Sequence, residues 1–323
     1  MNKIASFPWR WRHYGLALLG AASFLPAQAA TLFAVVTERA APTAIEAAHY
    51  HLASHPGDRI LLRTPAQLMA ASDQQLGQWI GKADSVLAVS VFGDPARRLK
   101  DALSRHARPQ TPVLAMNGEA SLNLMSRDAS GSLSHFPAET LRQLALENPP
   151  QAALTAADAQ PTARHWLSAR RIWQAGGRDN TLALFAHQLD PSQPLAAVKP
   201  EPTLRLRVGQ QELSDAAAWG NATKLGLQAT PTVVVLDLAN MDGDAPAALC
   251  QRINQQGQPC VQVLTRWGGA SRQALERLPE LIAPARPAAL VVLQDFVVGA
   301  AEGREALTGL SGNSMCRSSR RFA

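Results

Sequence analysis

The stretch "TPTVVVLDLANMDGDAPAALCQRINQQGQPCVQVLT", residues 230–265, decides the fold of the chain. It begins with a continuous apolar run over 232–238, which has the length and composition of a strand buried on both faces. A helix is predicted over 244–256, where Gly257 ends it, and a second short apolar strand over 260–264. A buried strand, a helix and another buried strand in this order predict a parallel βαβ unit.

The same alternation continues on both sides of this stretch. Downstream, a helix is predicted over 271–278 and a strand over 288–293. In the amino-terminal part, strands are predicted over 31–36, 59–62, 85–92 and 112–116, and helices over 42–54, 67–80 and 95–107. The predicted fold class is therefore α/β, with two parallel-sheet, flavodoxin-like units joined by a helical connector.

Two helices lie between the predicted sheet units. Residues 162–175 carry apolar side chains at helical spacing, Gly176-Gly177 ends that helix, and Asn180 is predicted to cap the next one, over 180–189. A proline-rich loop then runs to residue 202. The predicted divisions are a signal peptide (1–29), an amino-terminal α/β domain (30–150), a helical connector (151–200), a second α/β domain (201–310) and an aberrant or disordered tail (311–323).

The amino-terminal segment has the pattern of a secretory signal peptide. Three basic residues without an acid precede the short apolar run 15–25, and Ala27-Gln28-Ala29 is a small-residue cleavage motif. We predict cleavage after Ala29 and a periplasmic or otherwise exported protein with no stable membrane span; the alternative is an uncleaved anchor. The apolar run is shorter than the ~20 residues that a spanning helix needs.

The formal net charge of +6 does not indicate a nucleic-acid-binding protein. The segment up to Ala29 and the tail after Leu310 each hold three basic residues and no acidic ones, so the body between them is neutral. A neutral body lacks the basic surface that binds phosphate backbones. We therefore expect no nucleic-acid partner.

Cysteine is scarce, and its spacing fits no zinc motif. Cys250 and Cys260 are candidates for a disulfide in an oxidising compartment. Two small buried apolar side chains are the alternative.

Several stretches resemble the CobN and magnesium-chelatase large-subunit family. The stretch 230–265 is similar to a strand–loop–helix–strand segment of that family. "PAALVVLQDFVVGAAEGREAL" (287–307) resembles a later strand and the loop after it, and "ARRIWQAGGRDNTLALFAHQL" (169–189) is similar to a helix, a Gly-Gly-x-x-Asn turn and a second helix. The match covers most of residues 31–310.

The resemblance implies a role in metal–tetrapyrrole metabolism, namely ATP-driven cobalt insertion into a corrin precursor by a complex with AAA-type subunits. The implied ligand is a tetrapyrrole or corrinoid together with cobalt or another divalent metal. The chain departs from the family at "LRLRVGQQELSDAAAWG" (204–220), at Gln294-Asp295, in its leader and in its much shorter length. We therefore expect a truncated amino-terminal part that is inactive alone. The alternative is a periplasmic, non-enzymatic protein that binds a tetrapyrrole or a metal.

The end of the chain suggests a reason for the short length. A permitted choice of codons for Met315–Ala323, translated in another frame, resembles the family's continuation, which favours a frameshifted copy of a longer gene. A natural basic tail is the alternative.

Candidate ligand-binding residues lie where the predicted strands of the second unit end, because open parallel sheets bind ligands at that edge. Trp267, Gln294 and Asp295 are the candidates. Trp166, Trp173 and Trp219 are further aromatic residues that a flat tetrapyrrole could stack on, but the spacing of the first two is also that of helix packing.

Two features suggest metal ions. His51 and His55 lie one helical turn apart and are candidate metal ligands, with a solvated helix end as the alternative. The acidic cluster Asp237 to Asp244 has the oxygen ligands of a hard cation, but also the composition of a turn and helix cap. No nucleophile elbow, P-loop or dinucleotide motif occurs, so no catalytic residue is assigned.

Overall fold

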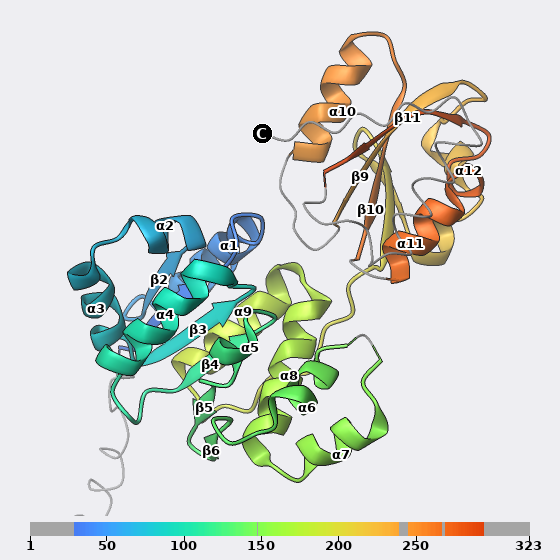
Figure 1. Cartoon of the computed structure of the whole chain (residues 1–323). Helices are drawn as coiled ribbons and strands as arrows, with labels where there is room; N and C mark the ends of the chain where they lie inside the picture. The colour runs from blue at the N-terminus through green and yellow to red at the C-terminus, as the bar shows by residue number, and fades with distance from the viewer. Residues whose placement is uncertain (1–28, 147, 239–244, 267–268, 294–323) are drawn as a thin grey trace, which may run out of the picture.

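The computed structural model describes residues 29–146, 148–238, 245–266 and 269–293. They form two α/β lobes, each built around its own sheet, which confirms the predicted fold class (Figure 1). The first lobe ends near Asp190 and the second begins near Thr203. The predicted signal peptide up to residue 28 and the predicted tail lie outside the described residues. None of the helices in the described part has the length and apolar character needed to cross a membrane.

The first sheet has four parallel strands in the order β2-β1-β3-β4, which is the flavodoxin-like order, and a short antiparallel extension, β5 and β6. Leu32 and Ala34 of β1 face one core, whereas Phe33 and Val35 face the other, so the strand is buried on both sides. The strands are β1 (Thr31–Val35), β2 (Arg59–Arg63), β3 (Ser85–Val89), β4 (Val113–Met116), β5 (Arg127–Asp128) and β6 (Gly131–Ser132).

Helices cover both faces of this sheet. One face is covered by α2 (Pro65–Ala70), α3 (Asp73–Lys82), α4 (Gly93–His106) and α5 (Ala120–Asn123). The other is covered by α1 (Ala41–Ser54), α6 (Ala138–Leu144), α7 (Gln151–Asp158), α8 (Pro161–Ala175) and α9 (Gly177–Leu189). The single helix predicted over 67–80 is thus two helices, because Ser72 starts a new one with a capping box.

The helices predicted as a connector belong to the first lobe. Trp166 of α8 and Phe185 of α9 are fully buried in the same cluster as Leu87 and Met116 of the sheet. Burying these aromatic side chains on the sheet removes more apolar surface from water than a free-standing helix pair would. The segment between the lobes is instead the linker, residues 190–203, which has no helix or strand.

The second sheet has the order β11-β9-β10-β7-β8. Its first three strands are parallel, and β7 and β8 form an antiparallel hairpin that the sequence analysis did not predict. Helix α10 (Ala245–Gln255) packs on one face. Helices α11 (Gly269–Glu276) and α12 (Leu278–Leu281) and the short helices η1 (Asp215–Ala218) and η2 (Ala222–Leu225) pack on the other. The strands are β7 (Leu204–Val208), β8 (Gln211–Ser214), β9 (Pro231–Leu238), β10 (Cys260–Thr265) and β11 (Arg286–Val292).

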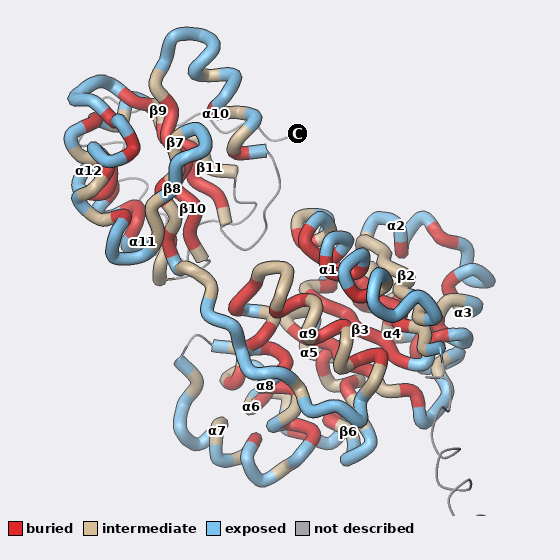
Figure 2. The backbone as a smooth tube through the Cα atoms, turned by 180° about the vertical axis from the view of Figure 1, so that it is seen from behind, coloured by how far each residue is buried: buried red, intermediate tan, exposed pale blue. Residues whose placement is uncertain are grey.

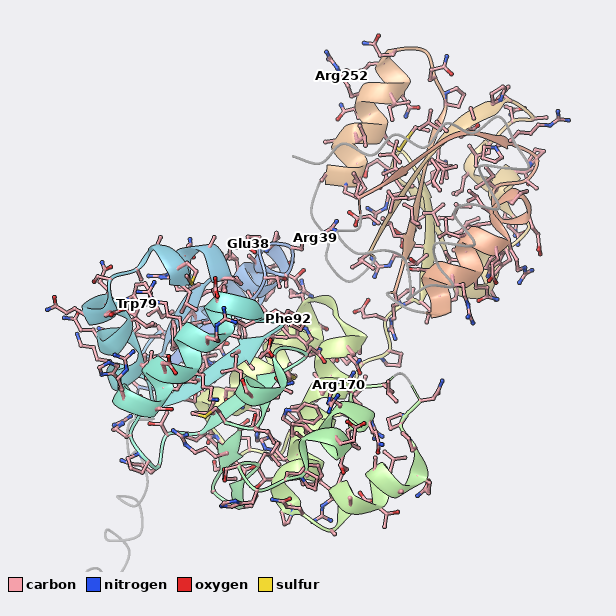
Figure 3. All side chains as sticks on the ribbon, in the orientation of Figure 1. Glu38, Arg39, Trp79, Phe92, Arg170 and Arg252 are labelled. Carbon is pink, nitrogen blue, oxygen red and sulfur yellow. A yellow bond between two sulfur atoms is a disulfide. The ribbon has the colours of Figure 1, made fainter. Side chains whose placement is uncertain are left out.

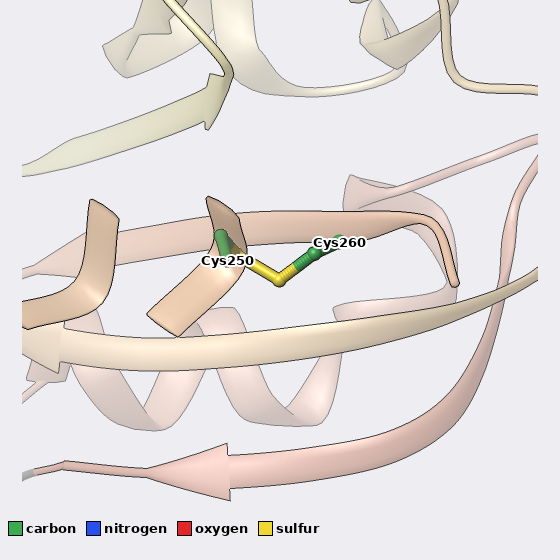
Figure 4. The surroundings of a disulfide bond; sticks show 2 residues. All are labelled: Cys250 and Cys260. Atoms are coloured by element: carbon green, nitrogen blue, oxygen red, sulfur yellow. A yellow bond between two sulfur atoms is a disulfide. The ribbon is translucent and has the colours of Figure 1, made fainter. Parts of the chain in front are cut away.

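A disulfide joins Cys250 of α10 to Cys260 of β10 (Figure 4). Both residues are buried and pack against Val235 of the neighbouring strand. The disulfide therefore adds a covalent link to the apolar contacts that hold α10 on its face of the second sheet.

Asn180 holds the linker against the first lobe. Helix α9 begins at Gly177, so Asn180 lies inside the helix and is not the predicted cap. Its side-chain amide donates hydrogen bonds to the carbonyl oxygens of Gly176, at 2.7 Å, and Lys199, at 2.8 Å. Its Oδ1 accepts the backbone N–H of Lys199 at 2.9 Å. Although Figure 2 shows the linker as largely exposed, its course is thereby fixed.

Replacing Asn180 by Ala should release this linker. The buried amide contributes three hydrogen bonds, so we expect the free energy of unfolding to fall by about 1–3 kcal/mol. Protease cleavage within 190–203 should become faster. Asn254→Ala, on the exposed side of α10, is the matched control and should change neither quantity. Equal cleavage rates in the original chain and Asn180→Ala would contradict the role given to this side chain.

Removing the disulfide should destabilise the second lobe. In Cys250→Ser/Cys260→Ser, we expect a loss of about 2–4 kcal/mol, because the bond restricts the unfolded chain. Thermal unfolding with and without a reductant measures it. The reductant should lower the melting temperature of the original chain but leave that of the double variant unchanged; an equal response of both proteins would count against the prediction.

Candidate functional site

The central strand of each sheet is flanked by a parallel strand on both sides. In the first lobe β1 lies between β2 and β3, and in the second lobe β9 lies between β11 and β10. Each sheet therefore reverses its strand order beside this central strand. Open parallel sheets bind ligands beside such a reversal, at the carboxyl ends of the strands. The loops after β1 and β9 are the expected ligand side.

These two carboxyl ends meet between the lobes. Arg39, in the loop after β1, donates from Nη2 to Oδ1 of Asp237 near the end of β9, at 2.5 Å. The Asp237 side chain is 5% exposed, so this ion pair is well shielded from water. Figure 3 shows Arg39 on the side of the first lobe that faces the second lobe. Asp237 belongs to the acidic cluster predicted as a cation site, and here its carboxylate binds Arg39. The other members of that cluster, Asn240, Asp242 and Asp244, lie outside the described residues.

An open pocket of about 800 Å³ lies where the linker enters the second lobe. This volume falls within the ~300–1,000 Å³ that small-molecule sites usually have. The first lobe, the linker and the second lobe all contribute residues to its lining, so its shape depends on how the linker is held. We call it the interlobe pocket; its lining residues are Ala175, Val198, Pro200, Glu201, Thr203, Asp215, Ala216, Trp219, Arg266, Gln273 and Arg277.

Two arginines and a tryptophan give the interlobe pocket its binding character. Arg266 follows β10, donates to the carbonyl oxygen of Glu201, and has a buried Nε with no acceptor among the described residues. The Arg277 guanidinium lies 4.2 Å from the ring centroid of Trp219 and donates from Nε to Glu280 at 2.8 Å. The pocket thus combines cationic donors with a flat aromatic surface.

The two acidic side chains of the pocket have structural partners. Asp215 accepts hydrogen bonds from the backbone N–H and the hydroxyl of Thr203, at 2.7 and 2.9 Å. Partial burial raises the pKa of Asp215, but these hydrogen bonds outweigh it, so the pKa is lowered and the carboxylate stays ionised. Glu201 pairs with Arg205 at 2.9 Å. Both carboxylates are thus engaged, and the charge of Arg266 also lowers the pKa of Asp215. The guanidinium groups of Arg266 and Arg277 are the cationic groups that line the pocket.

The corresponding edge of the first lobe has an unusual backbone. Ser90 and Asn117, directly after β3 and β4, have φ values of 57° and 53°, in the left-handed region that non-glycine residues rarely adopt. At Gly118, an added Cβ would lie 2.5 Å from the carbonyl oxygen of Val91, so the two loops touch through their backbones. Such conformations persist where the surrounding structure imposes them, and they gather at ligand sites.

Arg170 of α8 holds the left-handed backbone conformation of Asn117 in place. Its guanidinium is almost completely buried and donates to Oδ1 of Asn117 at 2.8 Å and to the carbonyl oxygens of Leu144 and Ala145. Burial lowers the pKa of Arg170 to about 10, so the group remains charged at neutral pH. The buried charge therefore ties the β4 loop to the loop after α6.

The tryptophans divide between core and pocket. Trp166 is buried and donates from Nε1 to the carbonyl oxygen of Ala115 at 2.7 Å, so it packs in the core. Trp219, which the sequence pattern did not favour over Trp267, lines the interlobe pocket. No local signal in the sequence identifies it, because most residues that line the pocket with it come from the linker, from the end of β10 and from the region of α11. The predicted ligand residues Trp267, Gln294 and Asp295 lie outside the described residues.

His51 and His55 are stacked rather than convergent. Their ring centroids are 4.4 Å apart with an angle of 10° between the planes. Nε2 of His51 already contacts Oδ2 of Asp58 at 2.7 Å, which ties the end of α1 to the turn before β2. In the described part of the chain, no group of three or more histidine, cysteine, aspartate or glutamate side chains is arranged to hold a metal ion.

No protein-family model matches the chain, and no curated protein matches it either. The resemblance to the CobN and magnesium-chelatase large subunits therefore stays a prediction. The described residues of the interlobe pocket offer cations, an aromatic ring and hydrogen-bond donors, and no nucleophile paired with a base is among them.

Replacing Arg170 by Leu tests the buried charge. We expect the free energy of unfolding to fall by at least about 2 kcal/mol, because three oxygen atoms that are buried or partly buried lose a charged donor. Chemical denaturation measures the change. Arg171→Leu is the matched control, since this neighbour is exposed, and should cost less than about 0.5 kcal/mol. Similar losses in both variants would show that the Arg170 contacts contribute little.

Proposed function

We propose that the chain is the amino-terminal, ligand-binding part of a CobN-like protein, and that it binds a carboxylate-bearing tetrapyrrole between its lobes without inserting a metal by itself. The observation that carries the proposal is the interlobe pocket, in which Arg266, Arg277 and Trp219 lie on one open surface.

The chemistry of the pocket suits this class of ligand. A tetrapyrrole joins a flat, largely apolar macrocycle to side chains that end in carboxylates. Arginine binds carboxylates with two parallel hydrogen bonds, and an indole ring packs against a flat apolar face. Arg266 and Trp219 supply one group of each kind.

The first lobe adds a favourable potential and an apolar contact. Helices α1 and α4 both begin at the carboxyl edge of the first sheet, so the positive ends of their dipoles lie at this edge. Phe92, at the start of α4, is 53% exposed, which is unusual for a large aromatic side chain. Both features lie at the same edge of the first sheet as Arg39, which contacts the second lobe.

Binding alone is favoured over ATP-driven insertion. The predicted leader would direct the chain out of the cytoplasm. Outside the cytoplasm, the ATP that AAA-type partner subunits need is absent. Two lobes with their carboxyl edges turned toward each other also form the arrangement that encloses a small ligand. An exported relative of a chelatase would therefore hold a tetrapyrrole, as a binding protein does.

Spectral titration tests the proposal. Haem and a corrinoid are added separately to the purified chain, and the absorption bands of the macrocycle report binding. We expect saturable one-to-one binding of at least one of them. Arg266→Ala and Trp219→Leu should each weaken it at least about tenfold, or about 1.4 kcal/mol. The control Arg252→Ala, on the exposed surface of α10 (Figure 3), should bind as the original chain does.

Circular dichroism of each variant separates lost binding from lost folding, and Arg266→Lys retains the charge where Arg266→Ala unfolds. Absence of saturable binding, or equal affinity in the original chain and in folded pocket variants, would contradict the proposal. Metal exchange into or out of the macrocycle by the chain alone would contradict the binding-only function.

A further inference from the structure

Two histidines outside the interlobe pocket point their ring nitrogens at each other. His165 of α8 and His187 of α9 have their Nε2 atoms 2.9 Å apart. The ring centroids are 4.8 Å apart and the planes are inclined by 71°. Both side chains are only partly buried, so solvent and small ions reach them.

The other nitrogen of each ring is engaged by an acceptor. Nδ1 of His187 lies 2.8 Å from the carbonyl oxygen of Gln193, which can only accept a hydrogen bond, so this Nδ1 carries the proton. Nδ1 of His165 lies 2.7 Å from Oδ2 of Asp128. A carboxylate oxygen accepts hydrogen bonds, so we place the proton of His165 on Nδ1 as well.

Both rings consequently turn a lone pair on Nε2 toward the same point. Two lone pairs at this separation repel each other unless a proton or a metal ion lies between them. A metal ion satisfies both lone pairs at once, whereas a bridging proton would add a positive charge to a partly buried pair.

The geometry is that of two imidazoles on one ion. With metal–nitrogen distances of about 2.0–2.1 Å and angles of about 90–110° at the metal, the two Nε2 atoms lie about 2.9–3.4 Å apart. The observed separation is within this range. Histidine ligands also usually donate their second N–H to a carboxylate or a backbone carbonyl, which orients the ring. Asp128 and Gln193 provide one acceptor of each kind.

We propose that His165 and His187 bind one divalent transition-metal ion, such as Cu²⁺, Ni²⁺, Zn²⁺ or Co²⁺, through their Nε2 atoms, with water completing the coordination. Asp128 and the carbonyl of Gln193 position the two rings. The proposal stands apart from tetrapyrrole binding, because none of these residues lines the interlobe pocket. It also differs from the sequence-predicted pair, since Nε2 of His51 is occupied by Asp58.

Titration of the chain, purified without a histidine tag, with Cu²⁺ tests this site by electron paramagnetic resonance. We expect one ion per chain, with hyperfine splitting from two nitrogen ligands. His165→Gln and His187→Gln should each weaken binding at least about tenfold and remove the two-nitrogen pattern, while Asp128→Asn should weaken it about 10–100-fold.

His55→Gln is the matched control and should leave affinity and spectrum unchanged. Circular dichroism verifies that each variant is folded, and the His187→Gln result stands where His165→Gln does not fold. Absence of stoichiometric Cu²⁺ binding, or folded variants that bind as the original chain does, would overturn the proposal and leave a proton-bridged pair as the state of the two rings. Since no tetrapyrrole is present, failure here is separate from failure of the proposed function.

Discussion

The course of the linker between the two lobes depends on the side-chain amide of Asn180. Its donor and acceptor pair with the carbonyl and N–H of a single linker residue, Lys199, in the way that one strand pairs with the next. In the second lobe, the guanidinium of Arg266 donates a hydrogen bond to the carbonyl oxygen of Glu201. The backbone N–H of Arg266 donates another to the carbonyl oxygen of Thr203. The linker is therefore held by the first lobe at one point and by the second lobe a few residues later. Because the linker supplies part of the lining of the interlobe pocket, both attachments help to shape it.

This constraint explains the Gly-Gly-x-x-Asn pattern at 176–180. Both glycines have positive φ, at 71° and 78°, and a side chain at Gly177 would collide with the carboxylate of Glu201. The glycines let α8 turn directly into α9 and leave room for the linker, and the asparagine then fixes it. The same two helices bury the aromatic core of the first lobe and carry His165 and His187. The hairpin of α8 and α9 thus contributes to the core of the first lobe, holds the linker and carries the proposed metal ligands.

The sequence predicted the features that depend on local patterns. Continuous apolar runs marked the buried parallel strands, and the predicted compartment made Cys250 and Cys260 candidates for a disulfide, which the structure contains. The sequence also carries local signals for two features that were not predicted, a helix start and a strand. Ser72 and Gln75 form a capping-box pattern that splits the helix predicted over 67–80, and the alternation of Leu204 and Leu206 with arginines is typical of a strand buried on one face.

The remaining features need the folded chain. Nothing near His165 indicates His187, because 22 residues separate them and the contact arises only when α8 packs beside α9. The interlobe pocket likewise joins Ala175 to Arg266, which belong to different lobes. The placement of α8 and α9 on the first sheet, and not in a separate connector, follows from burial of their aromatic side chains, which no periodicity assigns to a particular sheet.

Both lobes together are expected to form one site for a flat, anionic ligand. A crystal structure of the chain with a bound tetrapyrrole tests this most directly. We expect the macrocycle in the interlobe pocket, in contact with Trp219, with a carboxylate on the guanidinium of Arg266 and the linker unchanged at Lys199. A macrocycle bound to an outer surface of one lobe, without contact to Arg266, would rule such a site out.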